Sequence, residues 1–268
     1  MVLPTSALNQ NHMPHILRRS FHRLIEKIAR RKIWLEKTGI VVLPFSLLER
    51  IGSDYGGWIV PVKGFSERSI CYCGGAGEDI SFDLELIERF RCQIFSYDPT
   101  PRAIVHVQEL TTGNSNYHFF PVGLWDGDCV QKFYAPANES HVSHSILNLQ
   151  QTNTYFEAKC QRIKKLMEEN RHEHIDLLKI DIEGAEYKVL NSIIEDRLKI
   201  DVICVEFDEI HHPLDGNSDR RIAEICRDLL RVGWIPVAVD RGSNFTFIDK
   251  RRVPLFRRFL FQFLLLLN

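Results

Sequence analysis

From Ile70 onward, short runs of apolar residues alternate with segments in which apolar residues recur at helical spacing. This alternation predicts repeated strand and helix units on a mostly parallel sheet. The predicted strands are Ile70 to Cys73, Gln93 to Asp98, Tyr117 to Val122, Leu177 to Asp181, Val202 to Phe207, Trp234 to Asp240 and Asn244 to Ile248. Because only Arg241, Gly242 and Ser243 separate the last two strands, these must form an antiparallel hairpin. The expected fold class is therefore α/β, a doubly wound seven-stranded sheet that ends in a hairpin.

Helices are predicted where apolar residues share one helical face. They follow the first, fourth and fifth strands, around Phe82 to Phe90, Val189 to Ile194 and Ile222 to Leu230. The region from Asp126 to Asn170 is less regular and has no clear strand. We expect ligand-facing loops there and one helix over about Tyr155 to Asn170, because function concentrates in such connections.

The two ends of the chain depart from this pattern. His15 to Lys37 interleaves basic and apolar residues, which predicts a basic amphipathic helix, either packed on the domain or in contact with a membrane surface or a partner. Phe259 to Leu267 is an apolar run after several arginines, too short for a bilayer, which takes about 20 residues. This run packs along the domain, anchors at a membrane interface or lies exposed. The predicted parts are a basic helical extension (1–55), a main domain (56–250) and an Arg-rich, then apolar, tail (251–268).

The composition is that of an ordinary globular protein, with 268 residues, 44% of them hydrophobic and 26% charged, and a formal net charge of -1. This balance gives no reason to expect a nucleic-acid partner. The seven cysteines are an odd number without zinc-like spacing, so we expect reduced core thiols and no structural zinc. Since the N-terminus lacks the long apolar core of a signal peptide, the expected location is cytoplasmic, with peripheral membrane contact through either end as a variant.

The segment CYCGGAGED places Gly75 and Gly77 where the first strand turns into the first helix. Glycines there allow the turn and let a ligand approach the backbone, next to the free N–H groups of the helix start. Asp98 ends the second strand about twenty residues later, where a carboxylate can hold the hydroxyls of a ribose. The loop and the acid together predict a nucleoside site.

The residues of the same loop favour one nucleoside cofactor over another. A dinucleotide site requires a small residue where this chain has Ile80, and Glu78 and Asp79 put two carboxylates where a pyrophosphate would rest. S-adenosylmethionine instead carries an ammonium and a sulfonium group, which suit an acidic loop. An NAD-type oxidoreductase and a catalytically inactive cofactor-binding protein stay as alternatives.

The stretch LLKIDIEGAE carries an apolar strand directly into three carboxylates, Asp181, Glu183 and Glu186. Because ligands in an open α/β sheet lie outside the carboxyl ends of the strands, these acids are expected at a site. Glu186 is expected to face solvent from the following helix. Mg²⁺ held by Asp181, Glu206 and Asp208 is a less favoured alternative, based on the preference of that ion for oxygen ligands.

Seven segments carry a resemblance to a known family. They are GGW (56–58), GAGEDISFD (75–83), YDPTPRA (97–103), VGLW (122–125), SHS (143–145), LLKIDIEGAE (177–186) and VEFD (205–208). Because these segments occur together and in this order, the chain resembles the FkbM-type methyltransferases, which are class I enzymes that use S-adenosylmethionine. The resemblance implies a Rossmann-like seven-stranded sheet with a final hairpin, and O-methylation of a sugar, a glycan or a small metabolite.

The resemblance also implies roles for single residues. Gly75 and Gly77 would line the methionine part of the cofactor, Asp98 would hold the ribose, and Leu124 or Trp125 would lie near the adenine.

One position departs from the family pattern. Many class I methyltransferases have an acid two residues before the first loop glycine, where this chain has Cys73. The contact to the cofactor ammonium would then fall to Glu78, Asp79 or Asp83.

Methyl transfer to an alcohol needs the acceptor oxygen in line with the methyl group, about 3 Å away, and a base for its proton. Asp181 and Glu183 are the leading pair, one to meet cofactor or acceptor and one to take or orient the proton. Their alternative role is to stabilise a helix N-terminus, worth about 0.3 to 1 kcal/mol. His144 in a loop, and His211 and His212 after the fifth strand, are rival bases because histidine titrates near neutrality.

Overall fold

The computed structural model describes residues 48–136, 144–148, 151–211 and 213–253. The predicted basic helix, the apolar C-terminal run and His212 lie outside these residues. Within the described ranges, no helix is both long and apolar enough to cross a membrane.

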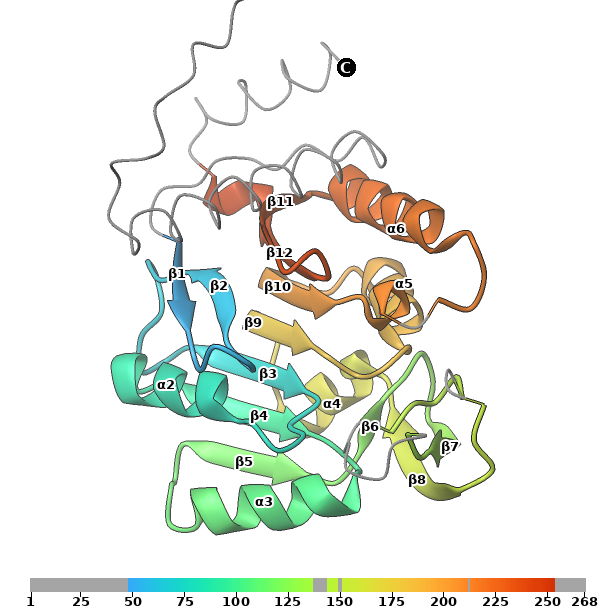
Figure 1. Ribbon diagram of the computed structural model, residues 1–268. Helices are drawn as coiled ribbons and strands as arrows, with labels where there is room; N and C mark the ends of the chain where they lie inside the picture. The colour runs from blue at the N-terminus through green and yellow to red at the C-terminus, as the bar shows by residue number, and fades with distance from the viewer. Residues whose placement is uncertain (1–47, 137–143, 149–150, 212, 254–268) are drawn as a thin grey trace, which may run out of the picture.

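A seven-stranded sheet forms the centre of the molecule (Figure 1). Its strands, in spatial order, are β11 (Trp234–Asp240), β12 (Asn244–Asp249), β10 (Ile200–Glu206), β9 (Ile175–Ile180), β3 (Ile70–Gly74), β4 (Gln93–Tyr97) and β5 (Tyr117–Phe120). The five strands from β10 to β5 are parallel, whereas β12 runs antiparallel to both of its neighbours. The seven predicted strands, the final hairpin and the fold class are thereby confirmed.

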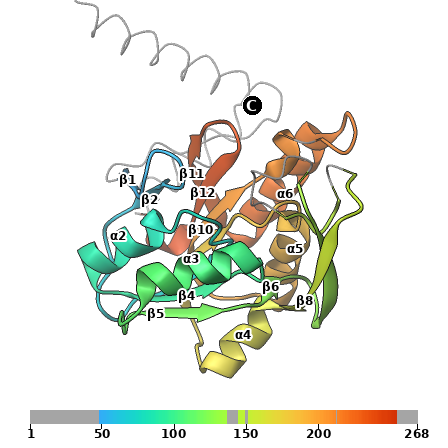
Figure 2. The same ribbon diagram turned by 60° about the horizontal axis from the view of Figure 1, so that its bottom comes forward.

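Alternate strand residues pack into two cores, one on each face of the sheet. On one face, the helices α4 (Ile163–Asn170), α5 (Glu186–Asp196) and α6 (Ser218–Val232) cover Tyr72, Leu178 and their neighbours. On the other face, α2 (Ser81–Phe90), α3 (Pro101–Thr111) and a hairpin of β1 (Leu48–Ile51) and β2 (Trp58–Pro61) cover Cys71, Leu177 and their neighbours. Figure 2 shows α2 and α3 on the opposite side of the sheet from α4. Burial on both faces explains why these strands are apolar throughout.

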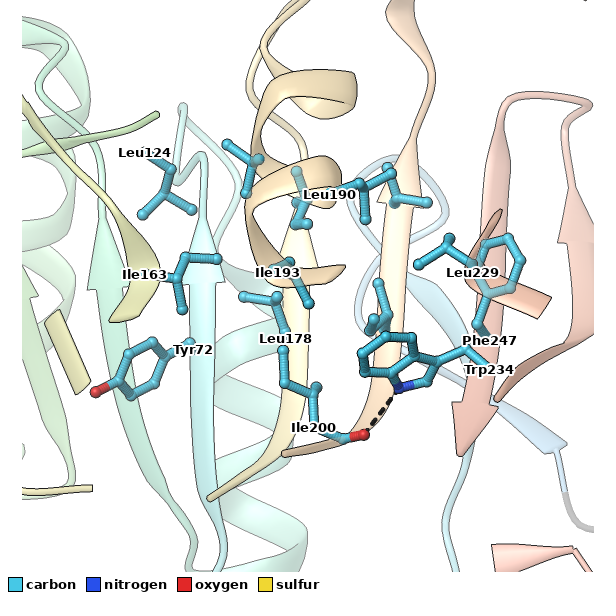
Figure 3. Packing of buried hydrophobic residues seen from close by; sticks show 14 of the residues in the cluster. Tyr72, Leu124, Ile163, Leu178, Leu190, Ile193, Ile200, Leu229, Trp234 and Phe247 are labelled. Atoms are coloured by element: carbon cyan, nitrogen blue, oxygen red, sulfur yellow. Dashed lines mark hydrogen bonds between the residues drawn. The ribbon is translucent and has the colours of Figure 1, made fainter. Parts of the chain in front are cut away.

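The first of these cores is drawn in Figure 3. Leu178 of β9 lies between Tyr72 of β3 and the residues that α5 contributes. Trp234 begins β11, and its indole N–H donates a hydrogen bond of 2.9 Å to the carbonyl oxygen of Ile200, so its one polar atom is satisfied inside the core. This packing fixes the parallel strand ends relative to one another.

The predicted helices are present, and their ends have a local cause. α6 ends at Gly233, which has a φ of 115° and donates its N–H to the carbonyl oxygens of Leu229 and Leu230. Glycine accepts this left-handed conformation without a steric penalty. After Gly233 the chain enters β11 directly.

The prediction of one helix from Tyr155 to Asn170 is wrong in its first half. Tyr155–Gln161 is the strand β8, and only Ile163–Asn170 is helical. β8 pairs with β6 (Gly123–Leu124) and β7 (Cys129–Tyr134) in a separate three-stranded sheet. Phe156 stacks on Phe133 across the β7–β8 pair, with ring centroids 5.2 Å apart. Such aromatic cross-strand pairs favour a strand over a helix.

All seven cysteines are free, and six of them are buried. Burial raises the pKa of Cys160 and of Cys204 to about 12. A buried thiol of this kind stays protonated and unreactive near neutrality. This matches the expected reduced core thiols.

Candidate functional site

A cavity of about 680 Å³ lies at the sheet edge to which β3, β4, β9 and β10 point their carboxyl ends. Cavities for small ligands commonly measure about 300 to 1,000 Å³. The strand order reverses between β3 and β9, which is where ligands bind in open α/β sheets. Two sets of residues matter most. We call residues 75–79 with Asp98 the glycine-loop wall, and Asp181, Glu183, Glu206 and Asp208 the carboxylate wall.

The glycine-loop wall begins where β3 ends. Gly75 has a φ of 81°, and a Cβ atom there would overlap the carbonyl oxygen of Asp181. Gly77 has a φ of 54°, but a Cβ atom there would meet no atom within 4 Å. Gly75 is therefore required by the close approach of β3 and β9, whereas Gly77 borders open space that a ligand can enter.

Asp98 follows β4 and holds this loop. One carboxylate oxygen, Oδ2, accepts hydrogen bonds from the backbone N–H groups of Ala76 at 2.9 Å and Gly77 at 3.0 Å, and Oδ1 accepts one from Thr100 at 2.8 Å. A carboxylate has about four lone-pair sites, so these three bonds leave about one. Asp98 can thus hold the loop and still accept one ligand hydroxyl.

The three acids expected to meet the ammonium group differ in their surroundings. Asp79 lines the cavity and accepts hydrogen bonds from Ser53 and Ser81; burial alone would raise the pKa of Asp79, but these bonds hold it below its usual value. Glu78 also lines the cavity and pairs with Arg102 at 2.7 Å.

Asp83 is the third of these acids, and it lies in the core. The hydroxyl of Tyr117 donates to its carboxylate at 2.9 Å, and burial raises the pKa of Asp83. Asp83 is not among the residues that line the cavity. Of the three acids, only Glu78 and Asp79 reach the cavity.

Lys179 of β9 joins the two walls and was not singled out from the sequence. It is 5% exposed, donates from Nζ to the carbonyl oxygen of Gly75 at 2.5 Å, and lies 3.3 Å from Asp181 Oδ2. Burial opposes the charge, but Asp181 and Asp83 raise the pKa of Lys179 above its usual value. A lysine inside an apolar strand, two residues before Asp181, is the signal that indicates a buried ion pair.

The carboxylate wall comes from the ends of β9 and β10. Asp181 and Glu183 lie in the turn after β9, where Glu183 has a left-handed φ of 54° and its carbonyl oxygen accepts a hydrogen bond from Ser145 at 2.6 Å. Glu206 ends β10 and accepts a hydrogen bond from Ser243 at 3.1 Å. Burial, and then the charge of Asp181, raise the pKa of Glu206 to about 7.

The prediction that Glu186 faces solvent is wrong. Glu186 begins α5, is fully buried, and its Oε1 atom accepts the backbone N–H of Gly184 at 2.7 Å. The turn before α5, in which Gly184 has a φ of 100°, brings the Glu186 side chain next to Asp208, which follows β10. Burial raises the pKa of Glu186 to about 7.

Both rival histidines within the described ranges line the cavity. His144 packs edge-on against Phe156, with ring centroids 5.1 Å apart. His211 Nε2 lies 3.2 Å from the hydroxyl of Ser243 and 3.6 Å from Glu206. Leu124 lines the cavity as well, whereas Trp125 is not among its lining residues.

Asp181, Glu206 and Asp208 are the candidate Mg²⁺ ligands. Among the described residues, the group whose ligand atoms lie within 4.8 Å of one another is His174, Asp176 and Asp201, on other parts of the sheet. Asp201 is already paired with Arg252 at 2.9 Å, which disfavours a cation there. Mg²⁺ at Asp181, Glu206 and Asp208 stays an untested alternative.

Comparisons with known proteins place the chain in context. Residues 60–231 match the family described as Methyltransferase FkbM domain. No curated protein matches the sequence. Solved structures that are similar include a fibrillarin pre-rRNA processing protein of Methanococcus jannaschii, with 13% identity, 69% of this chain and 68% of that chain covered, and a TM-score of 0.40. A fibrillarin of Aeropyrum pernix in complex with S-adenosyl-L-methionine has 9% identity, 76% and 84% coverage, and a TM-score of 0.40. A precorrin-6y C5,15-methyltransferase of Geobacter metallireducens has 12% identity, 69% and 84% coverage, and a TM-score of 0.38.

Proposed function

The chain belongs to the FkbM methyltransferase family and is an S-adenosylmethionine-dependent methyltransferase, and we propose that it methylates a hydroxyl group of a sugar, a glycan or a small metabolite. The observation that supports O-methylation best is the carboxylate wall, which lines the same cavity as the glycine-loop wall. An alcohol must lose its proton to become a good nucleophile, and carboxylates with raised pKa values are suitable bases.

The residues of the glycine-loop wall fit the cofactor. Gly77 leaves open space beside the backbone, and Asp98 keeps about one lone-pair site for a ribose hydroxyl. We assign Gly75 and Gly77 to the methionine part, Glu78 or Asp79 to its ammonium group, and Leu124, which unlike Trp125 lines the cavity, to the adenine. Asp181 adjoins this wall through Lys179 and is assigned to the cofactor as well as to catalysis.

The residues of the carboxylate wall would handle the proton. When bound, the cofactor supplies the methyl group as an electrophile. Lys179 Nζ lies 3.3 Å from the Asp181 carboxylate and holds it in place, so we assign Asp181 to orient the acceptor hydroxyl. Glu183 is assigned to take the proton of that hydroxyl. His144 lines the same cavity and is the alternative base.

The wider assignments are also proposals. We assign residues 56–250 to the methyltransferase domain, 1–55 to a basic helical extension that leads into β1, and 251–268 to an Arg-rich, then apolar, tail, with peripheral membrane contact through either end. We propose a cytoplasmic location and no nucleic-acid partner. The membrane contact of the tail is tested by flotation with anionic vesicles, using the full chain and a form that ends at Pro254. Equal binding by both forms would contradict a role of the tail in membrane contact.

The cofactor site is tested by calorimetry with S-adenosylmethionine and, separately, NAD. The wild type is expected to bind the first and not the second. Gly77→Arg is expected to lose binding because its side chain fills the open space beside the loop. Gly113→Arg is the matched control, since Gly113 also has a left-handed φ and open space around it but does not line the cavity. Wild-type affinity in Gly77→Arg would remove the loop from the site.

The acceptor is tested with radiolabelled S-adenosylmethionine and fractionated cell extract. The labelled product is expected to carry its methyl group on oxygen, and Asp181→Asn is expected to lower turnover about a hundredfold or more. A product labelled on nitrogen or carbon would contradict O-methylation. Unchanged turnover in Asp181→Asn would remove that residue from catalysis.

A further inference from the structure

Two buried carboxyl groups, Asp208 in the carboxylate wall and Glu186 behind it, each have one oxygen atom without a hydrogen-bond donor among the described residues. Glu186 Oε2 and Asp208 Oδ2 are both buried, and neither receives a hydrogen bond from an N–H or O–H group of the described residues. Glu186 is 0% exposed and Asp208 is 6% exposed. Leaving two such oxygens unpaired is costly, so the arrangement needs an explanation.

The explanation lies in their contact with each other. The carboxyl groups of Glu186 and Asp208 lie within reach of a hydrogen bond to each other. Two carboxylates cannot donate to one another, so this hydrogen bond exists only when one of the two carries a proton. The two residues belong to different segments, since Glu186 begins α5 after β9 and Asp208 begins the short 3-10 helix η2 (Asp208–Ile210) after β10.

The charges nearby do not supply a substitute for that proton. Glu183, Asp181 and Glu206 face Asp208 and are of like charge. Arg221 of α6 is bonded to Glu209 and Asp215, and the hydroxyl of Tyr187 is bonded to Glu209. His211 lies beside Glu206 and Ser243. A second negative charge on the pair would therefore be uncompensated.

We propose that Glu186 and Asp208 share one proton, and that Glu186 is a positioning residue that uses it to tie together the two segments of the carboxylate wall. Oε1 of Glu186 accepts the N–H of Gly184 and so holds the turn in which Glu183 adopts its left-handed φ of 54°. Oε2 of Glu186, through the shared proton, holds Asp208, which lines the cavity. Loss of the proton leaves two like charges in contact and separates the two segments.

The pH dependence follows from this arrangement. Burial raises the pKa of Glu186 to about 7, and burial and then the charge of Glu186 raise the pKa of Asp208 well above its usual value. The folded protein therefore binds more protons than the unfolded chain at mildly acid pH. The stability from this pair is present at low pH and is lost as the pH rises through about 7.

The test uses the full chain and the variant Glu186→Gln. The amide of glutamine accepts from Gly184 and donates permanently to Asp208, so the link between the segments stays without a titrating proton. Glu195→Gln is the matched control, since Glu195 is an exposed acid on the same helix, paired with Arg162. Asp208→Asn is the second variant, because its amide donates to Glu186 from the other side.

Two readouts decide the proposal. The infrared band of a protonated carboxyl group is expected in the wild type and in Glu195→Gln near about pH 6, and Glu186→Gln and Asp208→Asn are each expected to lose the part that belongs to the pair. The amide resonance of Gly184 is expected to shift in the wild type as the pH rises through about 7 and to stay fixed in Glu186→Gln, with that of Gly113 as the control.

Specific outcomes would overturn the shared proton. These are an infrared band of equal intensity in the wild type and both variants, or a Gly184 resonance that titrates alike in the wild type and Glu186→Gln. The melting temperature gives a further check. The difference in melting temperature between Glu186→Gln and the wild type is expected to rise by about 3 °C in favour of the variant from about pH 6 to pH 9. The proposal rests on the proposed function only in naming the wall a reaction site. Neither readout needs methyl transfer, so failure of one idea is distinguishable from failure of the other.

Discussion

The two walls of the cavity are both rich in carboxylates, but the pKa values of Asp79 on one wall and of Glu206 and Asp208 on the other shift in opposite directions. On the glycine-loop wall, Asp79 and Asp98 accept hydrogen bonds from backbone N–H groups, and those bonds help to hold the pKa of Asp79 down. On the carboxylate wall, Glu206 and Asp208 are crowded by other acids and their pKa values are raised. Donors from the backbone fix a charge for binding, whereas crowded acids retain or take up protons near neutrality.

The largest expected effect comes from the point where the walls meet. Gly75→Ala would place a methyl group against the carbonyl oxygen of Asp181 in a left-handed backbone conformation, and should destabilise the protein by about 3 kcal/mol or more. Gly77→Ala has the same strain but no collision, and should cost about 1 kcal/mol. Urea denaturation measures both. Equal losses would mean that the walls do not meet at Gly75.

The buried lysine that joins the walls should have the next largest effect. Lys179→Met removes the partner of Asp181 and should destabilise the protein by about 2 kcal/mol, less than a fully buried pair, because Asp181 is 30% exposed. The double variant Lys179→Met with Asp181→Asn should recover part of that loss, which a thermal denaturation series can measure. No recovery would show that Lys179 acts mainly through the carbonyl oxygen of Gly75.

A smaller effect is expected for the acid that holds the glycine loop. Asp98→Asn turns an amide N–H₂ group toward backbone donors and should weaken S-adenosylmethionine binding about tenfold, near 1.4 kcal/mol. Asp228→Asn, which removes a surface carboxylate paired with Arg231, is the control in the same calorimetric titration. Equal affinities for the two variants would deny Asp98 a role in the site.

The smallest effect concerns pH. The folded pKa of Glu206, about 7, lies above its ordinary value, so stability from this group is present at acid pH and is lost as the pH rises through about 7. Relative to the wild type, Glu206→Gln should therefore gain about 1 kcal/mol between about pH 6 and pH 8. Denaturation at the two pH values checks it. A constant difference would mean that Glu206 is already charged at acid pH.

The sequence predicts the central sheet well for a physical reason. Strands buried on both faces are continuous apolar runs, and the three residues between β11 and β12 leave only a hairpin. In β8, half-buried Phe156 and Ala158 alternate with exposed Glu157 and Lys159, which is a strand pattern. The helical spacing of α4 follows almost at once and obscures the boundary between the two elements.

The residues of the site also fall into those that the sequence predicts and those that it does not. Gly75, Asp98, Asp181 and Glu206 reach one cavity because parallel strands carry their carboxyl ends to one sheet edge. The contact of Lys179 with Gly75 depends on the register of β3 against β9, in which Cys73 lies opposite Lys179.

The burial of Glu186 depends on its contact with Asp208 after β10, and Tyr55 lines the cavity because it lies in the turn between β1 and β2. Trp125 is placed differently from its neighbour. It follows Leu124 in sequence, yet only Leu124 lines the cavity. None of these placements can be read from local spacing, because each is set by tertiary contacts.

A crystal structure of the full chain with S-adenosylhomocysteine tests the division between the walls most directly. The account predicts the ribose within hydrogen-bonding distance of Asp98, the methionine part beside Gly77, and the sulfur atom directed toward Asp181 and Glu183. A nucleoside seated among Glu206 and Asp208, with the glycine loop unoccupied, would contradict it.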